Sequence, residues 1–201
     1  MAGTRVFPLH LADVRIPEGD PRSGKPFPVV AHAVAHRDGF FLFDTGIGTG
    51  NAEIDEVFAP LRTSLQDALF PGRPIFAQER EFRMVHEPDY TVPEWIDVPG
   101  LSYELLDGEA GIAPGLRLIP TPGHTQGHQS LVVETDGGTV VLAGQAVQSI
   151  AEWEGANDPA SSGQASAMDR DAYARSVERL RGLGPAWVHF AHDPAVWERG
   201  G

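Results

Sequence analysis

The chain has 201 residues, enough for one domain with a sizeable buried core. Its formal net charge of −13 argues against nucleic acid or an anionic membrane surface as partner, because both would repel it. Cysteine is absent, which excludes disulfides, thiolate zinc sites and cysteine nucleophiles. The N-terminal residues lack a signal-peptide pattern and no apolar run approaches the length of a membrane span, so a cytoplasmic location is expected.

Short strands separated by Gly- and Pro-rich turns are predicted for the first half of the chain. Residues 29–36 alternate, residues 40–43 are apolar, and Asp38-Gly39 between them supplies a turn, which together indicate a hairpin. The other elements expected here are strands over 6–11 and 74–78, a short helix over 79–86, and weak helical character over 51–69 with Pro60 dividing it.

The second half predicts a strand-rich segment followed by one clear helix. Asp169 is a plausible N-cap for a helix through Arg181, because Tyr173, Val177 and Leu180 recur at helical spacing. The strands expected here cover 116–120, 130–135, 139–143 and 186–190, and residues 156–167 are expected to form a loop. Hairpins first and helices later indicate an α+β fold with mixed sheets, organised as a single domain over residues 1–201.

The most informative segment is Thr-Pro-Gly-His-Thr-Gln-Gly-His-Gln-Ser, residues 121–130. It lies between two predicted strands, so His124 and His128 are expected on a loop at a sheet edge, where sites are commonly built. The segment resembles the third metal-binding motif of the metallo-β-lactamase superfamily, and is most similar to that of the N-acyl homoserine lactonase branch. Asp44-Thr45-Gly46, the strand 140–144 and residues 190–193 match the family in the same order.

This resemblance implies an αββα sandwich and a metal-dependent hydrolase of lactone or ester bonds. It assigns His124 to the first metal and His192 to the second, and it places Gln145 where the family carries a metal-bridging Asp. Asp44 corresponds to a carboxylate that orients ligands, although stabilising its own loop is the safer expectation here. His128 is expected to hydrogen-bond to its loop rather than to bind a metal.

The departures from the family pattern matter more than the matches. The superfamily normally carries H-x-H-x-D-H after the D-T-G loop, whereas no H-x-H occurs anywhere in this sequence. One strand-and-motif unit is expected to be missing between about Leu69 and Phe70. His32 and His36 cannot replace it, because four residues along a strand span about 13 Å. Catalytic zinc needs three protein ligands and a water, so two histidines and an amide predict no metal cofactor.

A degenerate member of the family is therefore expected: a metal-free pseudoenzyme or repurposed enzyme that holds a small neutral or apolar molecule in the old cleft. No catalytic residue can be assigned. Tyr90, Trp95 and Trp153, with Tyr103, are candidates to line the pocket. The alternatives are a lactonase-like hydrolase with a single zinc on His124 and His192, and a shortened chain without activity. Loss of a strand would expose a sheet edge, which makes a homodimer a reasonable expectation.

Overall fold

The computed structural model describes residues 3–15, 18, 24, 26–44, 74–84, 86–87, 101–155 and 163–200. The chain divides into two compact units, one formed by Met1–Gly46 with Gly108–Gly201 and the other by Ile47–Asp107. The organisation as a single domain over residues 1–201 stays a prediction. Tyr90, Trp95 and the expected deletion at Leu69–Phe70 lie outside the described residues.

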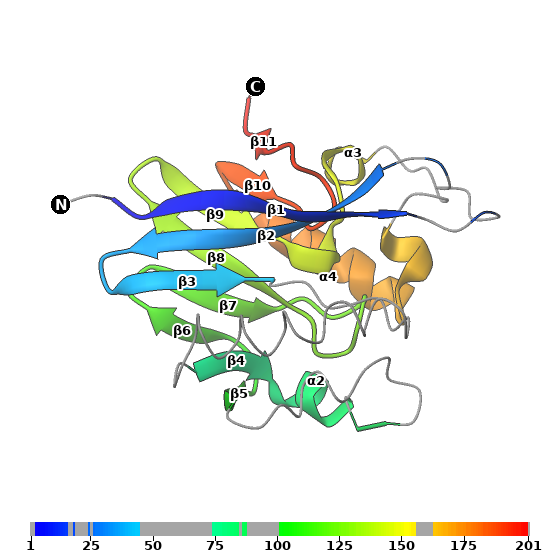
Figure 1. Cartoon of the computed structure of the whole chain (residues 1–201), viewed down its shortest axis with the longest axis horizontal. Helices are drawn as coiled ribbons and strands as arrows, with labels where there is room; N and C mark the ends of the chain where they lie inside the picture. The colour runs from blue at the N-terminus through cyan, green and yellow to red at the C-terminus, as the bar shows by residue number, and fades with distance from the viewer. Residues whose placement is uncertain are drawn as a thin grey trace. The chain divides into compact units, whose positions relative to one another are not determined.

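A three-stranded antiparallel sheet opens the larger unit, in the order β1-β2-β3 (Figure 1). Its strands are β1 (Arg5–Arg15), β2 (Pro26–His36) and β3 (Gly39–Phe43). Alternate residues of β2, namely Val30, His32 and Val34, are buried on one face. The predicted hairpin is confirmed, since His36 pairs with Gly39 at its closed end.

A six-stranded sheet forms the second layer, in the order β11-β10-β9-β8-β7-β6 (Figure 1). Neighbouring strands are antiparallel except for β9 and β10, which are parallel. The strands are β6 (Ala110–Ala113), β7 (Leu116–Pro120), β8 (Gln129–Thr135), β9 (Gly138–Leu142), β10 (Trp187–His189) and β11 (Trp197–Glu198). The prediction missed β6 and β11 and otherwise placed these strands correctly.

Helix α4 (Arg170–Gly182) packs against one face of the six-stranded sheet. The apolar residues of the helix, Tyr173, Val177 and Leu180, share a core cluster with Val132 and Val141 from two central strands. The helix begins at Asp169, whose side chain accepts a hydrogen bond from the backbone N–H of Ala172 at 2.8 Å, as the N-cap prediction required. Short turns η2 (Gly144–Ala146), α3 (Ile150–Trp153) and η3 (Gly163–Ser166) connect β9 to α4.

The opposite face of the six-stranded sheet meets the three-stranded sheet. The backbone N–H of Val30 donates to the carbonyl of Ala191 at 2.9 Å, and His36 Nε2 donates to the carbonyl of Pro114 at 3.0 Å. Between the layers, the rings of His32 and His189 meet edge to face with centroids 5.1 Å apart. The larger unit is thus a two-sheet sandwich covered by α4, and the expected α+β class is confirmed.

The smaller unit contributes a parallel pair of strands and one helix. These are β4 (Pro74–Gln78), α2 (Glu79–Met84) and β5 (Ser102–Leu106). The strand β4 and the helix were predicted, and β5 was not. Tyr103 of β5 packs its ring 5.0 Å from that of Phe82 on α2. Among the described residues, none of the helices is long and apolar enough to cross a membrane.

Candidate functional site

The loop that carries His124 and His128 joins β7 to β8 and is anchored at both ends. The Thr121 N–H donates to the carbonyl of His128 at 2.9 Å and closes the loop. The Asp169 N–H donates to the Gly123 carbonyl at 3.0 Å, which ties the loop to the start of α4. Gly123 has φ +143°, a conformation that L side chains rarely adopt, so this turn requires glycine at position 123.

Both ring nitrogens of His128 are engaged by protein groups. The Gln145 backbone N–H donates to Nε2 at 2.9 Å, so the proton of the neutral ring resides on Nδ1. Nδ1 lies 3.0 Å from the carbonyl of Thr121, to which it donates, and 2.9 Å from the hydroxyl of that residue. Burial, aided by the charge of the neighbouring His124, lowers the pKa of His128 to about 3 despite the bond to Thr121. The lone pair on Nε2 of His128 is therefore already occupied by the hydrogen bond from the Gln145 backbone N–H.

A buried hydroxyl chain continues from this ring. The Thr121 hydroxyl is 2.8 Å from the Ser130 hydroxyl, and Ser130 in turn donates to the carbonyl of Ala143 at 2.9 Å. Since Ser130 gives its proton to a carbonyl, the Thr121 hydroxyl is the donor in the bond between them. The chain joins β7, β8 and the end of β9, and it holds the residues before Gln145 in place.

Gln145 and His192, which are 47 positions apart, are in direct contact. Nδ1 of His192 donates to the carbonyl of Pro28 at 2.8 Å, which leaves a lone pair on Nε2. The Gln145 side-chain nitrogen donates to that lone pair at 2.6 Å. The Gln145 side-chain oxygen accepts from the Gln148 amide at 3.1 Å. Phe27 stacks on the imidazole of His192 with centroids 4.0 Å apart. We call Gln145, Gln148, His192 and Pro28 the amide clasp.

The segment after the clasp is fixed to its surroundings as well. The carboxylate of Glu152 accepts from the Gln148 backbone N–H at 2.7 Å and from the Tyr173 hydroxyl at 3.0 Å. The Asp193 carboxylate accepts from the Ile150 N–H at 3.1 Å. Residues 145–153 are thereby bonded to α4, to the end of β10 and, through the clasp, to β2.

His124, His128, Gln145 and His192 lie close together, and Gln145 is hydrogen-bonded to both His128 and His192. His124 is half-buried, with its ring 6.3 Å from that of His128. Asp44 follows β3 with φ +57°, a left-handed conformation that Asp tolerates. Phe27, Pro28 and Gln148 were not predicted. Their only sequence signal is weak: Gln148 stands three positions after Gln145.

The donor groups of the described residues are not arranged as a hydrolytic zinc site. Nowhere in the part of the chain that the structure describes do three His, Cys, Asp or Glu side chains gather as a metal would need. Nε2 of His128 accepts a hydrogen bond from the Gln145 backbone N–H, and Nε2 of His192 accepts one from the Gln145 side-chain amide. Zinc in catalytic sites takes three protein ligands.

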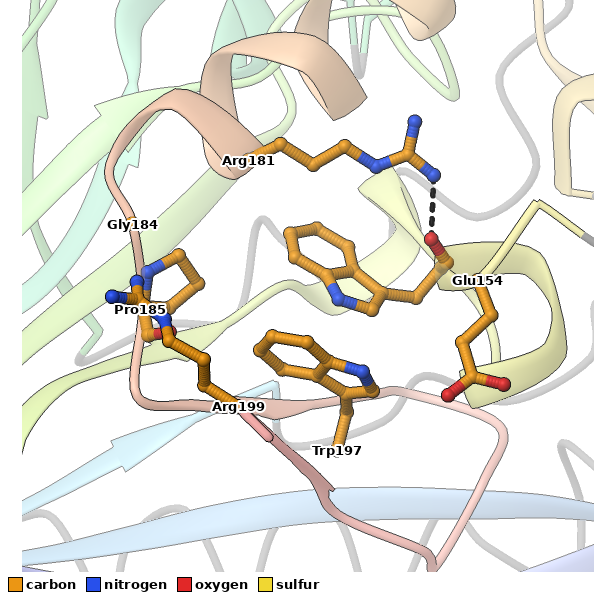
Figure 2. Close-up of a pocket in the computed structure, with 7 residues that line it drawn as sticks. Glu154, Arg181, Gly184, Pro185, Trp197 and Arg199 are labelled. Atoms are coloured by element: carbon orange, nitrogen blue, oxygen red, sulfur yellow. Dashed lines mark hydrogen bonds between the residues drawn. The ribbon is translucent and has the colours of Figure 1, made fainter. Parts of the chain in front are cut away.

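Trp153 lies away from the clasp, at the end of α3 in the core that α4 covers. Its ring packs against that of Trp197 at 5.6 Å. Trp153 instead lines a cavity beside the last turn of α4 (Figure 2).

Comparison with known proteins supports the fold and the family. The metallo-beta-lactamase superfamily model matches residues 75–192. An N-acyl homoserine lactonase of a Bacillus species is 33% identical over 128 residues, which cover 62% of this chain and 48% of that protein. A second N-acyl homoserine lactonase, AttM of Azorhizobium caulinodans, is 31% identical over 144 residues, covering 64% of this chain and 52% of that protein. The chain thus spans about half the length of the curated relatives it matches.

A solved structure of a quorum-quenching N-acyl homoserine lactone lactonase superposes with a TM-score of 0.72 at 21% identity. The superposition covers 96% of this chain and 94% of that one, and it establishes the shared fold. The two-sheet sandwich, the loop between β7 and β8, and the family match over more than half of the sequence all point to the same family. The chain belongs to the metallo-beta-lactamase superfamily.

Proposed function

We propose that this chain is a metal-independent binding protein on a lactonase-like fold, in which the amide clasp takes the place of a hydrolytic metal centre. The observation that carries the proposal is the bond between Gln145 and His192, with the Pro28 carbonyl fixing the tautomer of the imidazole. A side-chain amide bonded in this way connects the loops that a shared metal ion would otherwise connect.

Charge supports the same proposal. By the resemblance, the family carries an Asp where this chain has Gln145. A carboxylate at this position offsets the charge of two metal dications, whereas the neutral amide of Gln145 cannot do so. The H-x-H pair that would supply further ligands is absent from the sequence. Without zinc to lower the pKa of a bound water to about 7, the family's nucleophile is missing.

The clasp also suggests which class of ligand would bind beside it. His128 is neutral because of its low pKa, and His192 is held as a neutral tautomer by its two bonds. Neutral donors and acceptors do not compensate the cost of desolvating a strongly charged ligand. With the net charge of −13 as background, a small neutral or apolar molecule is the expected ligand.

The second candidate is a hydrolase with one metal ion. It is favoured by the persistence of His124 and His192 at both positions that the resemblance assigns to ligands, and by relatives named as N-acyl homoserine lactonases. For His192 to bind a metal through Nε2, the Gln145 amide must first leave. A third ligand would also be needed.

Metal analysis combined with a lactone assay distinguishes the two candidates. The chain is saturated with zinc, passed through a desalting column and analysed for bound metal, and is then incubated with N-hexanoyl homoserine lactone. We expect substoichiometric zinc and ring opening at the rate of the protein-free blank, while calorimetry detects binding of the intact lactone or another neutral ligand. Stoichiometric zinc with lactone opening that disappears in His192→Ala, but survives in the exposed control Gln126→Ala, would establish the hydrolase instead.

A further inference from the structure

A cavity of about 410 Å³ lies apart from the amide clasp, beside the last turn of α4 (Figure 2). It is formed by the end of α3, by Gly184 and Pro185 after α4, and by β11. None of its lining residues is bonded to Gln145 or His192 in the described part of the chain. It is largely open to solvent, and its volume falls within the range of small-molecule sites.

One wall of the cavity is aromatic and rigid. The indoles of Trp153 and Trp197 pack at 5.6 Å with an interplanar angle of 63°. Trp153 is 6% exposed, so Trp197 presents the more accessible ring. Arg181 holds this wall: its guanidinium lies 5.5 Å from the centre of the Trp153 ring and donates to the Trp153 carbonyl. Arg181 also pairs with Glu178 at 2.7 Å, so its charge is already compensated.

Arg199 also lines the cavity. Its Nε donates to the Pro185 carbonyl at 3.1 Å, and its backbone N–H donates to the Ala186 carbonyl at 2.9 Å. Gly184, at φ +59°, lets the guanidinium lie close: a Cβ there would be 2.9 Å from Nη2. Among the described residues no carboxylate is within ion-pair distance of Arg199, although the chain carries a net charge of −13.

These features define the chemistry of a ligand. An indole surface favours a planar aromatic ring, and a guanidinium matches a carboxylate through two parallel hydrogen bonds. The single guanidinium of Arg199 can compensate one negative charge on a ligand, because Arg181 is already paired with Glu178. Glu154, which also lines the cavity, would repel a ligand with several negative charges such as a nucleotide.

We propose that this cavity binds a small aromatic carboxylate, with its ring against Trp197 and its carboxylate on Arg199. This cavity shares no residue with the amide clasp. An experiment can therefore disprove ligand binding in the cavity without disproving the proposed function of the clasp, and the reverse also holds.

Calorimetry on the full chain tests the proposal with two ligands that differ only in charge. Indole-3-acetate is the probe, and indole-3-acetamide is its neutral counterpart. We expect the acid to bind at least about tenfold more tightly, because a hydrogen bond between two charged groups is stronger than one to a neutral amide. Arg199→Gln is expected to remove this preference, whereas Arg175→Gln, an exposed arginine of α4 outside the cavity, leaves it unchanged.

A second variant covers the case in which Arg199→Gln does not fold, which its thermal unfolding would reveal. Trp197→Phe keeps an aromatic ring at the wall and is expected to weaken the acid and the amide alike. The proposal fails if the parent chain shows no saturable binding, if acid and amide bind equally, or if Trp197→Phe and Arg199→Gln leave the affinity for the acid unchanged.

Discussion

The side-chain nitrogen of Gln145 lies 2.6 Å from Nε2 of His192, and the opposite nitrogen of the same imidazole lies 2.8 Å from the Pro28 carbonyl. A carbonyl only accepts, so the ring proton is on Nδ1, and the amide must donate to Nε2. The contact joins the start of β2, the end of β9 and the end of β10. Three segments far apart in the sequence are thus held together by neutral side chains.

Removal of the amide at position 145 should destabilise the fold. Gln145→Ala leaves Nε2 of His192 and the Gln148 amide without the bonds that they make in the parent chain. An unsatisfied buried polar group costs about 1–3 kcal/mol, which is the loss expected in the free energy of unfolding. Urea unfolding followed by circular dichroism measures it. Gln126→Ala, at an exposed position of the neighbouring loop, should stay within about 0.5 kcal/mol of the parent. Equal stability of the two variants would show that the clasp has no structural role.

Zinc and chelators should leave the thermal unfolding temperature unchanged. A ligand that binds only the folded state at about a hundred times its Kd stabilises that state by about 2.7 kcal/mol, which a melting curve detects easily. Because the described donors do not assemble a metal site, we expect the same transition in EDTA and in excess zinc. An upward shift in zinc that vanishes in both His124→Ala and His192→Ala would contradict the metal-independent proposal.

Stability should fall as the pH drops below about 6.5, which is the unfolded pKa of histidine. Burial lowers the pKa of His32 and His128 to about 3 and that of His189 to about 4. Between these values and about 6.5 the unfolded chain binds more protons, so stability is fully present above about pH 6.5 and is lost as the pH falls toward the folded values. Each group contributes a loss on the order of a few kcal/mol.

Two variants identify the source of this pH dependence in urea titrations from about pH 7 to about pH 4. His32→Leu removes a buried imidazole whose Nδ1 makes no hydrogen bond within the described part of the chain, and it should flatten the curve. Gln126→Ala, which removes no ionisable group from an exposed position, should not change the slope. If the free energy of unfolding of His32→Leu falls with pH in parallel with that of the parent chain, other groups are responsible for the pH dependence.

Periodicity predicted the central strands because their side chains alternate between two packed layers. Val30, His32 and Val34 show this directly, since all three are buried on one face of β2. The missed strands lacked such a signal. Strand β11 has two residues, and β6 is the short segment Ala-Gly-Ile-Ala. Short edge strands are defined by the neighbour to which they bond rather than by their own composition.

The candidate site was predictable only in part for a related reason. The loop with His124 and His128 is contiguous, so its sequence alone identifies it. The clasp joins Pro28, Gln145 and His192 through tertiary contacts that no local pattern encodes. Trp153 was predicted as a pocket residue, but its neighbours Trp197 and Arg199 come from the far end of the chain. Composition suggested an aromatic pocket without indicating which elements would form it.

Gly123 should not tolerate a side chain. A Cβ at this position would be 2.4 Å from Cα of Tyr173, and that backbone cannot move aside without displacing α4. Gly123→Ala is therefore expected to cost at least about 4 kcal/mol, in the range of severe steric or cavity effects. Gly155→Ala is the matched control: Gly155 also has a positive φ, +83°, but a Cβ there would meet no atom of the described residues within 4 Å.

Gly155→Ala should cost only about 1–2 kcal/mol, which is the strain of placing an L residue in the left-handed region. The difference between the two variants in urea unfolding reports the contact with Tyr173 together with the extra backbone strain of φ +143° over φ +83°. If both lose the same amount, the loop does not depend on its close packing against α4. In that case the bonds from Met168 and Asp169 to the loop carbonyls, at 3.3 and 3.0 Å, would suffice to hold His124 where it lies.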